Sequence, residues 1–542
     1  MTARRTGGRS ALRLIGSLAA AAALAISAVA CTADGNGTDG GGSAGEPTPG
    51  GDLTVLLDAG FAGGWATGLD PATSNTVGAN LPQNAAIFGG LFTLESDGDG
   101  GQIVPNQAEA YEWSDDGLTL SITLRDGLTF SDGTPLNAEA VVWNWIRALN
   151  SGSTGAPQLQ LDRTMTAPDL SAEFMDSLWA ALPEDVDRAT VEWQLGTIVA
   201  QDELTVSMTL TAINGSLVNG FPTSSLNLIA SPTAYAEIGA EEFSLAPVGA
   251  GPFVVVSDQL NERLELEKNP EYFKEGLPYL DALTFQSVAG DQVAYQTLLA
   301  GQGDVIEGLS SVPLITEAEN NPDVEVVLGT PTSPYVVQLN TRTAPFDDIR
   351  AREAIYYATD FAAINTGLFK DQGEMSQSFT ASGGLFYNPE VPGYRTYDLD
   401  KAKALVEELG GLTVNLGTTD IVTARSVTTA LQTQWQEAGI DVTIEAQPLG
   451  DVITDFIAGD WEAMLQTAGA WDPSVGIGVS VRFGSTSPFS GTPLPEGATS
   501  AADAIQRQLT TDLDGLLAEA IGTVDDGERA AKYEEVAKYI SD

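Results

Sequence analysis

The sequence predicts an α/β protein. Strand patterns dominate the first half of the 542 residues, whereas helical stretches alternate with short strands in the second half. Such alternation is typical of a largely parallel sheet covered by helices. Hydrophobic residues make up 43% of the chain, which is enough to form a large core. At roughly 150 residues per domain, the length suggests three or four domain-sized units.

The first half is expected to contain mainly strands and hairpins. Residues 52–57 predict a buried strand, and residues 111–130 alternate around a turn at Asp115-Asp116-Gly117, as in a β-hairpin. Residues 137–149 have helical spacing behind Asn137, a residue that favours the N-cap position. Further elements are expected as two strands within 191–211, a hairpin at 251–269, a strand at 283–288 and a helix at 292–300.

The second half is expected to alternate helices and strands. Helices are predicted at 348–365, 398–409, 427–438, 451–458, 501–521 and 526–540. Strands are predicted at 412–416, 441–445 and 463–467.

The first thirty residues have the features of an export signal. Four arginines form a positive start, residues 14–30 carry no charge, and the segment ends in small side chains. The uncharged stretch is short and alanine-rich for a membrane-spanning helix. These four arginines belong to the 24 basic residues, and the segment has no acid, so its removal would change the net charge from −50 to −54.

The single cysteine follows this segment directly. Ala28-Val29-Ala30-Cys31 resembles a bacterial lipobox, which implies that Cys31 becomes a lipidated N-terminus on the extracellular face of the cell membrane. Ordinary secretory cleavage beside a chance cysteine is the alternative. If Cys31 is lipidated, residues 31–51 would form the anchor and a flexible, glycine-rich tether with a reach on the order of 25 Å.

The ionisable residues exclude several classes of function. There are 74 acidic residues against 24 basic ones, and a net charge of −50 argues against binding to nucleic acid or to anionic lipid surfaces. The chain has no histidine, which excludes Ser-His and Cys-His catalysis and histidine-ligated metal sites. One cysteine excludes an intrachain disulfide. Carboxylate chemistry, Ca²⁺ binding and ligand binding remain open.

Five motifs occur in an order that resembles a known family. They are Gly68-Leu69-Asp70-Pro71, residues 124–142 (LRDGLTFSDGTPLNAEAVV), residues 246–253 (APVGAGPF), Asn269-Pro270-Glu271-Tyr272, and Asn340 with residues 345–355 (PFDDIRAREAI). Together they resemble the family 5 extracellular solute-binding proteins of ABC importers, the oligopeptide-, dipeptide- and nickel-binding group. None of the motifs needs a reaction to explain it.

The resemblance implies a two-lobed fold similar to periplasmic binding proteins of type II, with a cleft between the lobes. Lobe I would hold residues 52–88 and 228–332, with residues 89–227 inserted as a subdomain, and lobe II would hold residues 333–542. In the family the chain returns to lobe I after a helix such as 528–539. We therefore expect a return segment that these 542 residues lack.

The same resemblance implies capture of a solute by lobe closure and its delivery to an ABC transporter permease. Peptides are the expected ligands, held largely through main-chain hydrogen bonds, and a sugar or a chelated metal is the alternative. We expect a monomer without catalytic residues, metal site or cofactor.

Candidate ligand-binding residues follow from the resemblance. Asp472 is expected either to pair with the amino group of a peptide or to match a later, structural Asp-Pro, and Trp471 to form a wall of the cleft. Trp65 is a second aromatic candidate, or else an ordinary core or loop residue. Tyr335 and Asn340 lie on the expected hinge strand, where the backbone is close to the ligand. They are expected either to contact the ligand or to serve strand packing and a capped turn.

Three other functions stay open. A glycosidase needs paired carboxylates, but pairs such as Asp347-Asp348 arise by chance among 74 acids. The run at 97–100 (DGDG) would suit weak Ca²⁺ binding, although it lacks the spacing of an EF-hand loop. A sensor that captures a solute without importing it would have the same sequence features.

Overall fold

The computed structural model describes residues 2–5, 47–58, 64–74, 80–96, 101–151, 159–468 and 475–542. The chain divides into two compact units. The first comprises residues 1–95, 103–211 and 221–329, and the second comprises residues 96–102, 212–220 and 330–542. Within the described ranges, no helix is both long enough and apolar enough to cross a membrane.

Up to residue 329 the chain forms short strands and helices. The strands are β1 (Thr2–Arg5), β2 (Asp52–Leu57), β3 (Phe92–Ser96), β4 (Gly101–Pro105), β5 (Ala108–Trp113), β6 (Thr119–Leu124), β7 (Ile198–Ala200), β8 (Thr205–Thr209), β9 (Phe253–Gln259), β10 (Arg263–Lys268), β11 (Ala282–Ser287), β12 (Val305–Glu307) and β13 (Val324–Val327). The α-helices are α1 (Leu81–Ile87), α2 (Ala138–Asn150), α3 (Ala172–Ala181), α4 (Arg188–Thr197), α5 (Pro232–Leu245), α6 (Gly290–Leu299) and α7 (Val312–Glu319).

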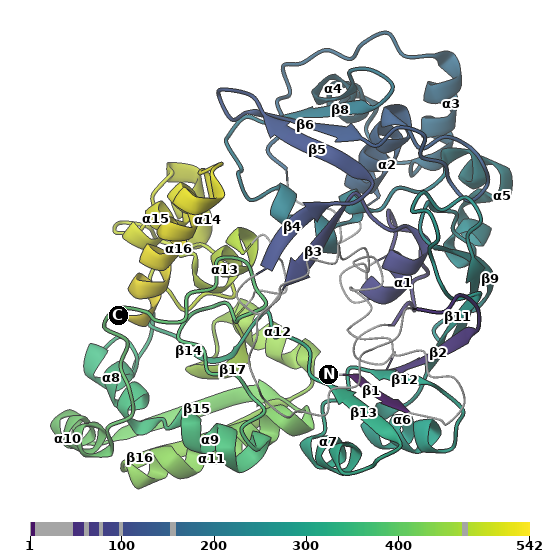
Figure 1. Cartoon of the computed structure of the whole chain (residues 1–542). Coiled ribbons are helices and arrows are strands. Elements are labelled where there is room, and N and C mark those ends of the chain that lie inside the picture. Colours follow the sequence, from purple (N-terminus) through teal and green to yellow (C-terminus); the bar gives the residue numbers. More distant parts are fainter. Residues whose placement is uncertain are drawn as a thin grey trace, which may run out of the picture. The chain divides into compact units, whose positions relative to one another are not determined.

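The main sheet of the first unit has seven strands in the order β13-β1-β12-β2-β11-β10-β9 (Figure 1). β2 runs parallel to β11 and β12, and its residues Val55 and Leu56 are fully buried. This confirms the buried strand predicted at 52–57. β1 pairs antiparallel with both β12 and β13, so residues from the expected export signal complete the sheet in this structure.

A second sheet, β5-β6-β8-β7, carries the predicted hairpin, and α2 packs on β7 and β8. Asn137 caps α2 as expected, because its side-chain Oδ1 accepts a hydrogen bond from the backbone N of Ala140 at 3.0 Å. The prediction of strands from 191 onward was wrong for residues 191–197, which belong to α4. Asp187 caps this helix. The helix buries Val191 and Leu195, which lie four residues apart on one face.

The second unit is built on the sheet β14-β17-β15-β16 (Figure 1). Its strands are β14 (Tyr335–Leu339), β15 (Leu412–Thr419), β16 (Ile440–Gln447) and β17 (Ala463–Thr467). Its helices are α8 (Ile349–Ala358), α9 (Phe361–Ile364), α10 (Leu399–Leu409), α11 (Val422–Glu437), α12 (Leu449–Ala458), α13 (Gly476–Phe483), α14 (Ala501–Arg507), α15 (Asp512–Ile521) and α16 (Asp526–Ser541). β15 runs parallel to β16 and β17, as the alternation of helices and strands predicts, whereas β14 is antiparallel to β17.

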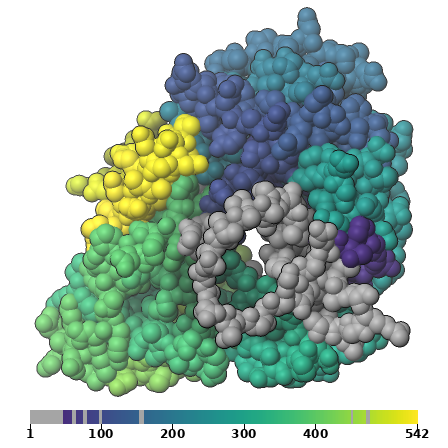
Figure 2. Space-filling model, viewed as in Figure 1, coloured from purple at the N-terminus to yellow at the C-terminus, as the bar shows by residue number. Residues whose placement is uncertain are grey.

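The core of the second unit lies between this sheet and the helices α8, α10 and α11. Trp435 of α11 is fully buried there, and its indole Nε1 donates to the hydroxyl of Thr359 at 2.9 Å. Residues 501–542 form one contiguous surface of the unit, yellow in Figure 2. They contain three helices where the sequence predicts two, because Gln508 adopts a left-handed conformation and Thr511 starts α15 with a capping box.

Candidate functional site

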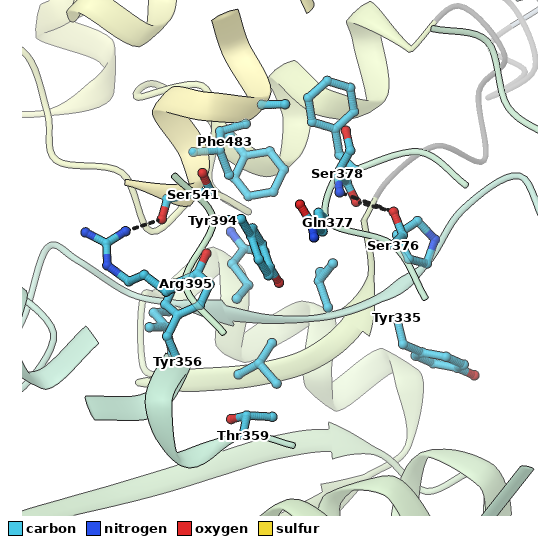
Figure 3. Close-up of a pocket in the computed structure, with 18 of the residues that line it drawn as sticks. Tyr335, Tyr356, Thr359, Ser376, Gln377, Ser378, Tyr394, Arg395, Phe483 and Ser541 are labelled. Atoms are coloured by element: carbon cyan, nitrogen blue, oxygen red, sulfur yellow. Dashed lines mark hydrogen bonds between the residues drawn. The ribbon is translucent and has the colours of Figure 1, made fainter. Parts of the chain in front are cut away.

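A cavity of about 1180 Å³ lies within the second unit. Ligand pockets for small molecules typically span about 300–1,000 Å³, so this volume suits a ligand at or above the upper end of that range. All five residues of β14 line the cavity. Further lining residues include members of α8, of the loop 373–381 and of the end of α16, together with Tyr394 and Arg395 (Figure 3).

The walls of the cavity combine apolar and polar side chains. Val427, Leu465 and Phe483 supply apolar surface, together with Ile355 of α8. Charged groups, including Glu353 and Arg395, line the same cavity. Such a mixture favours binding of a ligand with apolar groups and a few polar contacts.

Arg395 links two of the helices that line the cavity, α8 and α16. Its Nη1 donates to the backbone oxygen of Ser541 at 2.8 Å, and its Nε and Nη2 lie 3.2 Å from one oxygen of Glu353 (Figure 3). An oxygen of Asp542 lies 3.7 Å from Nη1. The guanidinium therefore links the last turn of α16 to α8. This contact places a positive charge at the carbonyl end of α16, where a cation is favourable.

Two tyrosines lie beside Arg395. The rings of Tyr356 and Tyr394 meet edge to face at 5.6 Å. Burial raises the pKa of both phenols above the ordinary value. Both phenols therefore stay neutral at physiological pH and present an O–H group rather than a negative charge.

Serines in the loop 373–381 supply further polar groups. The Ser376 hydroxyl donates to the backbone oxygen of Thr380 at 2.7 Å and accepts from the backbone N of Ser378 at 3.2 Å (Figure 3). The hydroxyls of Ser333 and Ser378 are buried and have no hydrogen-bond partner in the described residues. Both residues line the cavity, but these two hydroxyl oxygens themselves have almost no accessible surface.

The predicted ligand residues Tyr335 and Asn340 lie in different environments in the structure. Tyr335 lines the cavity and is 46% exposed. Asn340, at the end of β14, is buried: its side-chain Nδ2 donates to the Trp461 carbonyl at 2.8 Å, and its Oδ1 accepts from Arg342 N at 3.2 Å. These hydrogen bonds correspond to the capped turn, one of the two alternatives that the sequence allows for Asn340.

Trp65 is also a core side chain here. It is fully buried in the first unit, and its indole Nε1 donates to Asp258 Oδ1 at 2.8 Å. Trp471, Asp472 and Cys31 lie outside the described residues. Their roles in ligand binding and lipidation stay predictions.

Tyr356, Tyr394 and Arg395 were not singled out in the sequence. The available signal was weak: a Tyr-Arg pair follows Pro392-Gly393 in a segment without apolar periodicity, where a loop is expected. Groups of three or more His, Cys, Asp or Glu residues that could hold a metal ion are absent from the described part of the chain. The apolar and polar residues that line the cavity are suited to binding through apolar contact and hydrogen bonds.

Solved structures of binding proteins share this fold. CtaP, an ABC transporter substrate-binding protein of Listeria monocytogenes, matches with a TM-score of 0.68 at 21% identity, covering 91% of each chain. The oligopeptide-binding protein AppA of Bacillus subtilis, solved with a nonapeptide, matches with a TM-score of 0.61 at 18% identity over 92% of each chain. The chain therefore has the mixed α/β fold of the two-lobed binding proteins.

Relatives in sequence are also named as binding proteins. The glutathione-binding protein GsiB of Pectobacterium atrosepticum is 28% identical over 399 residues, which cover 71% of this chain and 68% of that protein. Heme-binding protein A of Haemophilus influenzae is 25% identical over 451 residues, which cover 80% of this chain and 76% of that protein. Residues 102–488 match the middle region of the bacterial extracellular solute-binding proteins, family 5. Because this match spans most of its length, the chain belongs to family 5 of the bacterial extracellular solute-binding proteins.

Proposed function

We propose that this protein binds peptides outside the cell and delivers them to an ABC transporter permease. The observation that carries the proposal is the family match over residues 102–488. The relative named as glutathione-binding supports a peptide ligand, because glutathione is a tripeptide. The cavity of about 1180 Å³, with apolar walls and hydrogen-bonding groups, is consistent with ligands of that chemistry.

Anchoring by a lipid on Cys31 is part of the proposal. A tethered binding protein stays close to its permease while it samples the surrounding solution. The glycine-rich residues 32–51 would give the folded units freedom to move on such an anchor.

Calorimetric titration of the purified protein with glutathione and with di- to octapeptides tests the ligand. A peptide ligand should also raise the melting temperature, because a ligand at one hundred times its Kd stabilises the native state by about 2.7 kcal/mol. The matched control is the corresponding mixture of free amino acids. Absence of binding by every peptide, with clear binding of a sugar or a chelated metal, would refute the peptide assignment.

Heme is a second candidate, favoured by the Haemophilus relative. Protein ligands to heme iron include His, Cys, Met and Tyr, and this chain contains no His. Titration with hemin, followed by its absorption spectrum, distinguishes the two candidates. A saturable spectral change at one equivalent, without peptide binding, would favour heme.

A further inference from the structure

The dipeptide Asn-Gly occurs three times in the chain, and two of these copies lie within residues 212–220. They are Asn214-Gly215 and Asn219-Gly220, and the third is Asn36-Gly37, which lies outside the described residues. Asparagine deamidates most readily before glycine, because glycine has no Cβ to hinder the approach of its nitrogen to the asparagine side chain. Residues 212–220 therefore carry two sites for one reaction.

Deamidation at such a site needs a free backbone nitrogen. The glycine nitrogen gives up its proton and attacks the side-chain carbonyl carbon of the asparagine, and the side-chain amide leaves with a proton as ammonia. Water then opens the resulting succinimide ring at either carbonyl, which gives aspartate or isoaspartate. The sum consumes one water and releases one ammonia, and no oxidant or reductant takes part. A hydrogen bond from the glycine N–H opposes the attack, because that bond must break first.

Residues 212–220, the docking segment, belong to the second unit, although the chain on both sides of them belongs to the first. Gly215 N donates to the backbone oxygen of Ile521, the last residue of α15, at 2.8 Å. A Cβ atom on Gly215 would overlap the Thr523 backbone oxygen and lie 2.6 Å from Arg529 Nη1. Only glycine fits this close approach to the turn between α15 and α16.

Buried side chains of α16 complete the contact. Arg529 is 1% exposed, and its Nη1 donates to the Thr523 backbone oxygen at 3.0 Å. Ser216 is 2% exposed, and its Oγ lies 3.5 Å from Tyr533 Oη. The Oδ1 atom of Asn214 is buried as well. While the segment is docked, the nitrogen that would attack Asn214 is therefore held by α15.

The second site, Asn219-Gly220, is protected in a different way. It lies in the 3₁₀-helix η2 (Val218–Thr223), and Gly220 N donates to the Leu217 backbone oxygen at 3.1 Å. This hydrogen bond is internal to the docking segment. Separation of the segment from α15 would therefore free the nitrogen of Gly215 and leave that of Gly220 bonded.

We infer that Asn214 is a conditional modification site, which deamidates only in molecules whose docking segment has left α15. Isoaspartate adds one carbon to the main chain directly before Gly215, where the close approach leaves no room for an added atom. The modified segment should therefore not dock again, so the modification makes a temporary separation permanent. This inference concerns the second unit itself and does not depend on the ligand.

Peptide mapping by mass spectrometry, after incubation of the full chain at neutral pH, tests the inference. Each site is compared with itself in protein unfolded by urea. In the folded wild type, Asn214 and Asn219 should both deamidate about tenfold more slowly than in urea, or slower still, because the reaction must wait for local opening. Hydrogen exchange should show a correspondingly slow amide at Gly215.

Two glutamate substitutions separate docking from folding. Ser216→Glu places a charged side chain at a buried position, so it should undock the segment without changing the Asn-Gly dipeptide. Ala212→Glu adds the same charge at an exposed position of the same segment and is the matched control. Ser216→Glu should bring the rate at Asn214 to within about threefold of its rate in urea and leave Asn219 slow. Ala212→Glu should leave both sites slow.

Wild type in urea below its unfolding transition gives the same comparison without a variant. Local release of the docking segment should speed the reaction at Asn214 at lower urea concentrations than at Asn219. If both sites accelerate together in this titration, opening is general rather than confined to the segment, and the inference is refuted.

Three further results would overturn the inference. One is deamidation of Asn214 in the folded wild type as fast as in urea, which would show that docking gives no protection. Another is an equal rate at Asn214 in Ser216→Glu and Ala212→Glu. The last is slow exchange at the Gly215 amide in the purified isoaspartate form, which would show that the modified segment docks again. None of these results bears on peptide binding.

Discussion

Asp70, from the first family-like motif, forms a buried ion pair in the first unit. Its carboxylate accepts a hydrogen bond from Arg147 of α2, and both side chains are 1% exposed. The Arg147 guanidinium also lies 4.2 Å from the ring centroid of Tyr235. Its Nε and Nη1 atoms have no hydrogen-bond partner among the described residues. The motif therefore has a structural role, and the buried charge of Arg147 depends on Asp70.

Asp70→Asn should destabilise the protein by about 3–5 kcal/mol, because it leaves a buried arginine without its counter-charge. Chemical denaturation measures this change. Arg350→Gln is the matched control, since it breaks the exposed pair between Arg350 and Asp348 and should cost less than about 1 kcal/mol. Equal costs for the two variants would contradict the importance of burial.

Asp258 is a second residue whose environment has a measurable consequence. Burial raises the pKa of its carboxyl to about 6, against the smaller opposing effect of the hydrogen bond from Trp65. Its Oδ2 atom has no partner in the described residues. Between about pH 4 and pH 6 the native state therefore holds a proton that the unfolded state releases, and stability decreases as the pH rises through this window.

Asp258→Asn should be more stable than wild type at pH 7, by about 1 kcal/mol after allowance for solvent screening of a half-buried group. Asparagine keeps an acceptor for Trp65 and carries no charge. The difference should shrink as the pH falls below about 6 and become small by pH 3.5, where the native carboxyl is protonated and the unfolded one mostly so. Thermal unfolding from pH 3.5 to 8 measures it, and a gap that is constant across this range would contradict the raised pKa.

At the scale of elements, local signals in the sequence determine helix starts well. Asn137 caps α2, and Ser231 followed by Pro232 starts α5, with the Ser231 hydroxyl accepting from Ala234 N at 3.1 Å. Residues 191–197 show the opposite case, because apolar and β-branched residues favoured a strand where the cap at Asp187 starts a helix.

Asn137→Ala should destabilise the protein by about 1 kcal/mol, because it removes the acceptor for Ala140 N at the start of α2. Asn137→Ser, which keeps a capping oxygen, should stay within a few tenths of a kcal/mol of wild type. The midpoint of urea unfolding measures both variants. A cost of the same size in Asn137→Ser would show that the cap is not the cause.

At the scale of the whole molecule, the chain is a strongly acidic family 5 solute-binding protein, with a net charge of −50. The acidic residues are spread through the sequence, and they favour solubility and repulsion from an anionic cell envelope. They do not mark a ligand site. The cavity in the second unit is lined by arginines as well as acids, so the strong net charge of the chain does not by itself describe the charge of the cavity.

Cys31→Ser should release the protein from the cell membrane into the medium, because it removes the thiol on which we propose the lipid is carried. Fractionation of cells, with labelling by a fatty-acid analogue, measures the anchor. Thr32→Ser, one residue later, should leave the protein labelled and in the membrane fraction. Persistence of Cys31→Ser in the membrane fraction, without label, would contradict the lipid anchor.

The sequence by itself determined the α/β class, the family and many element boundaries, because turns, caps and motifs depend on residues only a few positions apart. It also placed Tyr335 on a strand, and the structure shows that this strand lines the cavity. Only the tertiary structure decided that Trp65 and Asn340 are buried. It alone brought Arg395 to Ser541, 146 residues further along the chain, and paired β14 with β17 beside a cavity that all five residues of β14 line. Burial and cavities depend on which distant segments pack together, and that packing leaves no local pattern in the sequence.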